Sequence, residues 1–265
     1  MKQKLIYLLP NKLFLLLKGY GWYGNFDNWK QAEMQSEGYD SDFILSKVKE
    51  STLKVKNGEA VYERDSVLFD KIEYSWELLT MLMWIAAQNK GELNVIDFGG
   101  SLGSTYYQNK TFLDTLSSVS WNIVEQANFV DEGKKDFETD NLKFYSSIKE
   151  CISDKQKPID LLLFSGVLQY LECPYKLLDE AVTYKTPYIF IDRTGFAMND
   201  KDRITVQKVP SYIYKGSYPC WFFGERKFHN FFKQNNYELI TEFKALDVTN
   251  IPSQYKGFIY KRNNA

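Results

Sequence analysis

The sequence of 265 residues contains only three cysteines and one histidine. Cys151, Cys173 and Cys220 lie far apart, and no CxxC pair occurs. A zinc site built from Cys and His ligands is therefore not expected, and an odd number of separated cysteines argues against a disulfide framework. We expect no metal centre. Cysteines of this kind are typical of a reducing compartment, which favours a cytoplasmic protein.

The sequence also has no excess of charge of either sign. Its 33 basic residues are balanced by 34 acidic residues, which gives a net charge of −1. A protein that coats nucleic acid usually carries a basic excess that displaces counterions, so nucleic acid is not an expected partner. Apolar residues make up 44% of the chain and charged residues 25%, which is the composition of a globular protein with a substantial core.

No apolar run is long enough to cross a bilayer. The first 18 residues place basic residues ahead of apolar ones, as a signal peptide does. However, Pro10, Asn11 and Lys12 interrupt the run, and no small-residue cleavage site follows. The longest unbroken apolar piece, residues 13–17, is far too short to span a membrane. We favour a short helix packed on the domain; the alternative is an interfacial helix that makes a peripheral membrane contact.

Strand and helix patterns alternate through most of the chain. Apolar residues at three- and four-residue steps predict a helix over residues 69–89, ended by Lys90 and Gly91. The expected strands are residues 93–98, 119–125, 142–145, 159–164, 187–191, 237–242 and 258–261. Further helices are expected at residues 42–50, 105–117, 129–138, 147–153, 171–182 and 225–235. The last two strands are joined by a loop that contains Pro252, so they can pair as an antiparallel hairpin.

This alternation predicts an α/β fold. We expect a Rossmann-like, seven-stranded, mostly parallel sheet with helices on both faces and an antiparallel C-terminal strand. We assign residues 69–265 to this domain and residues 1–68 to a mainly helical N-terminal extension or lid. Such an arrangement places ligands beyond the carboxyl ends of the strands, near the point where the strand order reverses.

Small residues are concentrated directly after the first strand of this sheet, from Asp97 through Gly99, Gly100 and Ser101 to Gly103. Small residues there let the backbone approach a ligand and adopt positive φ. The dinucleotide pattern G-x-G-x-x-G fits neither register, and the P-loop pattern also fails. The acid-x-G-x-G-x-G loop of S-adenosylmethionine enzymes does fit, with Ser101 in place of the middle glycine.

The second strand ends in Glu125. A carboxylate at that position can accept two hydrogen bonds from ribose hydroxyls. The alternative is a solvated acid at a strand end. We favour the ribose role because strand, acid and glycine turn agree with one another.

Four stretches together resemble class I S-adenosylmethionine-dependent methyltransferases: VIDFGGSLGSTYYQ, WNIVEQ, FSGVLQYLECP and YIFIDRTGF. With GYDSDFIL, YERDSVLFD and SYPCWFF, they are similar to a methyltransferase family encoded among bacterial surface-polysaccharide genes. The similarity covers the chain from about Gly19 onward. It implies S-adenosylmethionine as cofactor and methyl transfer to a small molecule or a glycan in polysaccharide biosynthesis.

The resemblance also implies which residues bind the cofactor. The turn from Asp97 to Gly103 would contact its methionine and adenosine parts, and Glu125 would hold the ribose with Gln126 beside it. The methionine end would be lined by Ser165, Gly166 and Val167; the alternative for these is an ordinary strand-to-helix connection. Ser146 and Ser147 stand where many relatives place an acid that binds the adenine amine, so hydroxyls or backbone would serve here.

Four residues are candidates for substrate binding or proton transfer. Asp192 could accept a proton, and Arg193 could bind a carboxylate or phosphate; the alternative for this pair is an internal ion pair. His229 suits proton transfer at neutral pH, although a lone helical histidine is more often a surface residue. Arg64 is a candidate clamp on the cofactor or a substrate carboxylate, within a charged triplet that is otherwise a solvated turn.

Two other interpretations stay open. The chain could be a non-catalytic binding protein that retains the methyltransferase fold and uses its N-terminal 70 residues as an interface. A nicotinamide-dependent oxidoreductase is disfavoured by the failed dinucleotide spacing. The aromatic stretch at residues 217–224 fits either stacking on a sugar or core packing.

Overall fold

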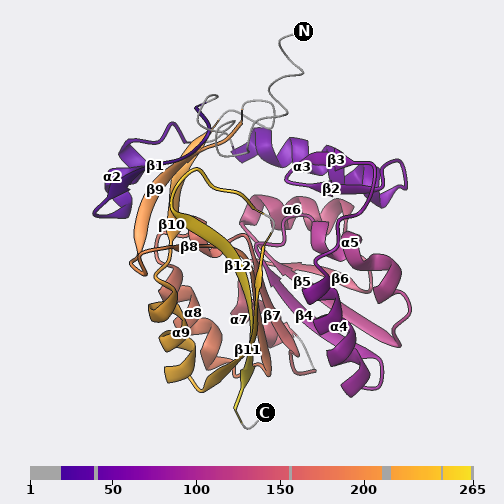
Figure 1. Cartoon of the computed structure of the whole chain (residues 1–265). Helices are drawn as coiled ribbons and strands as arrows, with labels where there is room; N and C mark the ends of the chain where they lie inside the picture. The colour runs from indigo at the N-terminus through magenta and orange to yellow at the C-terminus, as the bar shows by residue number, and fades with distance from the viewer. Residues whose placement is uncertain (1–18, 39–40, 155–156, 211–215, 246, 264–265) are drawn as a thin grey trace.

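The structure is a computed structural model that describes residues 19–38, 41–154, 157–210, 216–245 and 247–263 (Figure 1). The helix expected within the first 18 residues lies outside these ranges. Within them, no helix combines the length and the apolar character needed to cross a membrane.

Seven strands form the main sheet in the order β11-β12-β8-β7-β4-β5-β6. Their bounds are β4 (Glu92–Phe98), β5 (Ser118–Val124), β6 (Leu142–Tyr145), β7 (Leu161–Ser165), β8 (Tyr188–Ala197), β11 (Tyr237–Lys244) and β12 (Ser253–Arg262). The five strands from β6 to β8 pair in parallel, whereas β12 is antiparallel to both β8 and β11. The predicted Rossmann-like sheet with an antiparallel C-terminal strand is confirmed.

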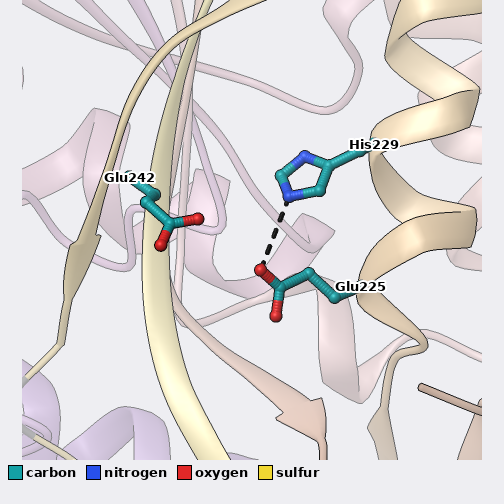
Figure 2. Close-up of side chains that lie close together, drawn as sticks. All are labelled: Glu225, His229 and Glu242. Carbon is teal, nitrogen blue, oxygen red and sulfur yellow. Dashed lines mark ion pairs between the residues drawn. The ribbon is translucent and has the colours of Figure 1, made fainter.

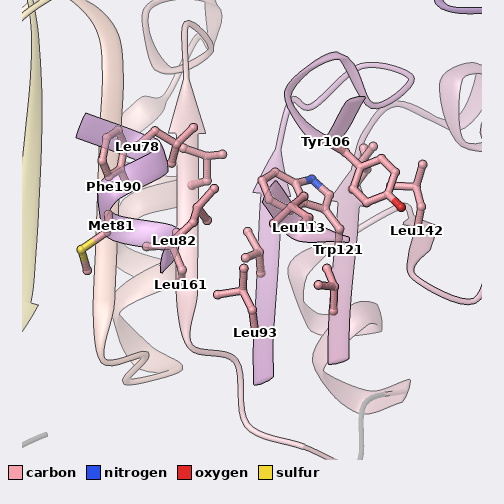
Figure 3. Close-up of a cluster of buried hydrophobic side chains, with 14 of the residues drawn as sticks. Leu78, Met81, Leu82, Leu93, Tyr106, Leu113, Trp121, Leu142, Leu161 and Phe190 are labelled. Atoms are coloured by element: carbon pink, nitrogen blue, oxygen red, sulfur yellow. The ribbon is translucent and has the colours of Figure 1, made fainter. Parts of the chain in front are cut away.

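Helices cover both faces of this sheet. One face packs against α3 (Ser41–Lys56), α4 (Trp76–Gln88), α5 (Ser104–Leu113) and α6 (Ala127–Asp136), and the other against α7 (Ile148–Asp154), α8 (Pro174–Thr183) and α9 (Glu225–Gln234). Figure 3 shows the first of these layers, where Leu78 and Leu82 of α4 face Leu161 and Phe190. The strands at the centre of the sheet are covered on both faces, so five of the seven residues of β4 and four of the five residues of β7 are buried.

A second, three-stranded antiparallel sheet was not predicted from the sequence. It consists of β1 (Gly21–Phe26), β9 (Arg203–Lys208) and β10 (Ser217–Phe222), with α2 (Trp29–Met34) beside it. It lies at the upper left of Figure 1, where β8 extends beyond its predicted end and Phe196 bridges to Phe223. The N-terminal segment therefore contributes a strand to the body of the molecule as well as helices.

The predicted helix over residues 69–89 is shorter than expected and begins only at Trp76. Phe69 instead ends the hairpin of β2 (Tyr62–Arg64) and β3 (Val67–Phe69), where it pairs with Tyr62. The two turn residues, Asp65 and Ser66, both have positive φ, as a two-residue hairpin turn requires. The ring contact of Phe69 with Tyr62, at 5.7 Å between centroids, explains why this aromatic residue is not on the helix.

Candidate functional site

Four residues lie at one level across the carboxyl ends of adjacent strands. In the sheet register, Phe98 pairs with Val124 on one side and with Phe164 on the other. The residues that follow these three are Gly99, Glu125 and Ser165, so they lie at the same level. Asp192 of β8 pairs directly with Ser165. Strands lie about 4.8 Å apart, so the row from Glu125 to Asp192 spans about 14 Å. It crosses the point where the strand order reverses, which is where open α/β sheets bind ligands.

A cavity of about 440 Å³ lies over this row. This volume suits one small-molecule ligand. The wall comes from α3, the β2–β3 hairpin, residues 73–78, the glycine turn, α5, α6, residues 243–245 and Asp247. Of the residues predicted from the sequence, it is lined by Arg64, Asp97, Gly99, Gly100, Ser101, Glu125, Ser165, Asp192 and Arg193.

The turn after β4 depends on its small residues. Gly99, Ser101 and Gly103 all have positive φ, and the Gly99 N–H donates to the Val124 carbonyl at 2.9 Å. A Cβ at Gly99 would lie 2.5 Å from Val167, and one at Gly100 would lie 2.6 Å from the Asp97 carboxyl carbon. Larger side chains at these two positions would collide with their neighbours, so backbone lines the cavity here.

Two carboxyl groups face this turn. Asp97 is buried and accepts a hydrogen bond from the Trp121 indole N–H at 3.2 Å. Burial raises the pKa of Asp97 to about 7, an effect that the Trp121 bond opposes and the Glu125 charge reinforces. Glu125 accepts from the backbone N–H groups of Ser101 (3.3 Å) and Gln126 (2.8 Å), while burial raises its pKa.

Asp192 and Arg193 end the row at β8. The Asp192 carboxylate is 6% exposed and accepts from the Arg193 backbone N–H (2.7 Å) and the Ser75 hydroxyl (3.3 Å). Burial raises the pKa of Asp192 to about 6.

The Arg193 guanidinium donates twice to Asp247, at 3.2 Å each, and once to Asp65 at 3.3 Å. Burial lowers the pKa of Arg193, but the two carboxylates outweigh this and hold it well above its ordinary value. The side chain therefore forms an internal ion-pair network, the alternative to anion binding. This network joins the β2–β3 turn to the segment after β11.

The charged triplet before α4 contributes a buried acid that the sequence analysis did not select. Glu63 is 1% exposed and accepts hydrogen bonds from the Ser104 hydroxyl and the Ser66 N–H, while burial raises its pKa. Arg64, which was selected, lines the cavity 3.9 Å from Glu73. Glu63 occupies an inward position of a three-residue strand, a pattern too short to detect from the sequence.

Several predicted site residues do not line the cavity. Gln126 is exposed, Gly103 is buried, and Gly166 and Val167 are half-buried outside the cavity wall. Ser146 and Ser147 cap α7 instead: the Ser146 N–H donates to the Glu150 carboxylate at 2.8 Å, and the Ser147 hydroxyl accepts from the Glu150 N–H at 3.1 Å. Their role at adenine stays a prediction.

His229 lies on α9, on the opposite face of the sheet from α3 to α6. His229 therefore does not line the cavity over the sheet, because α9 packs its phenylalanines against the other face. His229 bonds to the Tyr260 hydroxyl at 2.7 Å and lies 3.6 Å from Glu225, with Glu242 nearby (Figure 2). The Lys256 ammonium is 2.7 Å from Glu225, so the chain itself supplies a cation to these carboxylates.

The aromatic stretch at residues 217–224 forms β10 and packs in the core. Phe222 and Phe223 are fully buried, and the Trp221 indole donates to the Leu171 carbonyl at 3.0 Å. None of these side chains lines the cavity over the sheet. Phe222 and Phe223 therefore pack in the core, whereas Tyr218 and Trp221 are half-buried.

No protein-family model matches the chain, and no curated protein matches it by sequence. Solved structures do share the arrangement. The N-terminal domain of EvdMO1, in the presence of S-adenosylhomocysteine and D-fucose, is 12% identical, with 86% of this chain and 98% of that chain covered at a TM-score of 0.49. The 1,6-didemethyltoxoflavin-N1-methyltransferase of Burkholderia thailandensis is 10% identical, with 85% and 92% covered at 0.46.

The magnesium protoporphyrin IX methyltransferase of Synechocystis PCC 6803 is 11% identical, with 71% of this chain and 79% of that chain covered at a TM-score of 0.45. At such identities, the functional assignment rests on the topology and site geometry of the chain itself.

Proposed function

We propose that this chain is an S-adenosylmethionine-dependent methyltransferase acting on a small molecule. The observation that carries the proposal is one cavity, at the reversal of strand order, that contains both the positive-φ turn after β4 and the acid that ends β5. The Ser101 N–H bonds to Glu125, so these two features form one surface.

The residues fit the cofactor in three ways. Glu125 has further acceptor capacity for ribose hydroxyls beyond its two backbone bonds. Gly100 presents only backbone to the cavity, because a Cβ there would collide with the Asp97 carboxyl group. Phe129 of α6 is half-buried in the cavity wall on the Glu125 side, where an adenine ring would find an apolar surface.

When bound, S-adenosylmethionine supplies a methyl group activated by a positively charged sulfur. The chain then has to align an acceptor and keep water away. Asp192 stands at the far end of the row from Glu125, where its carboxylate can take a proton from the acceptor. The network of Arg193, Asp65 and Asp247 holds the N-terminal hairpin over this end of the cavity.

The sequence resemblance supports a finer assignment, to a cytoplasmic enzyme of bacterial surface-polysaccharide biosynthesis with a small molecule or a single sugar unit as acceptor. The cavity volume is consistent with an acceptor of that size.

A thermal-unfolding series tests the cofactor class. A ligand at about a hundred times its Kd stabilises the folded state by about 2.7 kcal/mol, which raises Tm by about 5–10 °C for a chain of this size. We expect this rise with S-adenosylhomocysteine and no rise with NAD or ATP. A rise with NAD alone would replace the proposal with an oxidoreductase, and no rise with any of them would leave a binding protein.

A further inference from the structure

The cavity is strongly acidic. Carboxylates outnumber cations among its lining residues: Glu63, Asp65, Glu73, Glu77, Asp97, Glu125, Asp192 and Asp247 against Arg64, Arg193 and Lys244. The two arginines are already paired, Arg193 with two carboxylates and Arg64 with Glu73. A phosphate or carboxylate that entered this cavity would therefore meet mainly like charge, with both guanidinium groups already paired and the exposed Lys244 as the remaining cation of the wall.

Asp192 is a buried carboxylate in the wall of this cavity. It is 6% exposed, and within the described ranges no lysine or arginine nitrogen forms an ion pair with it. Its two hydrogen-bond donors, the Ser75 hydroxyl and the Arg193 N–H, are neutral. Buried charges in proteins are ordinarily paired, so the cation for Asp192 is expected to come from a ligand.

Two aromatic residues line the same cavity as this carboxylate. Ser75, which bonds to Asp192, is flanked in sequence by Tyr74 and Trp76, and all three line the cavity. The rings of Tyr74 and Trp76 lie 5.1 Å apart, and Phe112 meets Tyr74 edge-on at 5.4 Å. Trp76 is 61% exposed, so core packing does not account for its position. A carboxylate and aromatic rings that line one cavity can together bind an ammonium group.

We propose that the acceptor is an amine-bearing small molecule, bound through its ammonium group by Asp192 and the rings of Tyr74 and Trp76. This inference rests on the proposed function and names its acceptor class. It excludes phosphorylated and carboxylated acceptors, which the acidic wall repels.

The transfer balances as an N-methylation. The acceptor ammonium gives one proton to the Asp192 carboxylate, and the freed nitrogen lone pair forms a bond to the methyl carbon. The carbon–sulfur bond breaks at the same time, so the sulfonium becomes a neutral thioether and the product nitrogen carries its positive charge. Asp192 then returns its proton to solvent. A pKa of about 6 leaves Asp192 mostly ionised at neutral pH and thus able to accept that proton.

Three sugars matched in size test the charge preference: glucosamine, glucose and glucuronate. Their affinities are measured by saturation-transfer NMR, on the chain alone and on the chain with S-adenosylhomocysteine. Close charge pairs are coupled by about 1.5 kcal/mol or more, so we expect glucosamine to bind at least about tenfold more tightly than glucuronate. Equal binding of the three, tighter binding of glucose or glucuronate, or no binding of glucosamine would overturn the proposal.

Two variants and a control localise the preference. In Asp192→Asn, the preference for glucosamine over glucose should disappear, whereas Asp131→Asn, an equal charge change on the exposed side of α6, should leave it intact. Trp76→Leu changes an exposed position and should fold normally. It should reduce the preference about two- to fivefold, which corresponds to one exposed cation–π contact. A preference that survives in Asp192→Asn contradicts the proposal.

These experiments can contradict the cofactor assignment and the proposed ammonium site independently of each other. Binding of S-adenosylhomocysteine without any preference among the sugars would leave the methyltransferase proposal standing and remove the amine acceptor. A preference for glucosamine in a chain that does not bind S-adenosylhomocysteine would remove the methyltransferase proposal and keep an ammonium-binding site.

Discussion

The backbone N–H of Ser101 donates a hydrogen bond to the Glu125 carboxylate over 3.3 Å, and so joins the turn after β4 to the end of β5. Ser101 can do this because its φ is +55°, in a region that favours glycine. The serine that replaces the middle glycine of the loop pattern therefore adopts the glycine conformation.

Glu125→Ala should weaken binding of S-adenosylhomocysteine by about tenfold or more. Each hydrogen bond to a charged group contributes about 1.5–3 kcal/mol, and the variant loses those to the ribose. Calorimetric titration measures the change. Gln126→Ala is the matched control, because Gln126 is adjacent, exposed and outside the cavity wall. Equal losses in both variants would show that Glu125 does not contact the ligand.

Gly100→Ala should destabilise the fold by about 1–3 kcal/mol, as overpacking does. The added Cβ would lie 2.6 Å from the Asp97 carboxyl carbon, so one of the two residues has to move. Urea unfolding of Gly100→Ala, Asp97→Ala and the double variant gives the coupling between them. Because Asp97→Ala removes the colliding group, the double variant should be less destabilised than the sum of the single variants. Strict additivity would mean that no collision occurs.

The stability of the ligand-free chain should depend on pH through Asp97. Its pKa is about 7 in the folded chain and about 3.8 ordinarily, so between these values the folded state keeps a proton that the unfolded state has lost. The contribution of Asp97 to the free energy of unfolding is therefore complete below about pH 4. It falls by up to about 1.4 kcal/mol per pH unit as pH rises toward 7. Urea unfolding from pH 4 to 7 should show a flatter dependence for Asp97→Asn, and parallel curves would contradict the assignment.

The Arg193–Asp247 pair should be coupled by about 1 kcal/mol in a double-mutant cycle. Its two hydrogen bonds are charge-assisted, and both side chains are 28% exposed. The Lys157–Glu92 pair serves as a comparison, since its side chains are 65% and 50% exposed and surface pairs contribute little. A coupling no larger than that of the surface pair would show that the network does not hold the hairpin in place.

The main sheet could be predicted from the sequence because its strands are long, apolar and separated by amphipathic helices. The same pattern located the turn from Asp97 to Gly103 and the acid at Glu125, since both stand at strand ends. Strand β1 could not be predicted, because it pairs with β9 across about 180 positions of the chain. Glycines and isolated aromatics in residues 19–38 conceal this strand.

The end of the site around Asp192 was harder to predict from the sequence. Asp192 was identified because it follows an apolar strand, but Asp247 lies in a loop without any motif. Ser75 and Trp76 were placed inside a helix, although they begin it and face the cavity. Conversely, His229 was selected only because histidine suits proton transfer. The type of a residue does not predict on which face of a sheet its helix packs.

The most direct measurement is a calorimetric titration of the purified chain with S-adenosylhomocysteine. We predict one site per chain with micromolar affinity or tighter. A folded chain that shows no heat of binding with either S-adenosylhomocysteine or S-adenosylmethionine would contradict the cofactor site over β4 and β5, and with it the proposed activity.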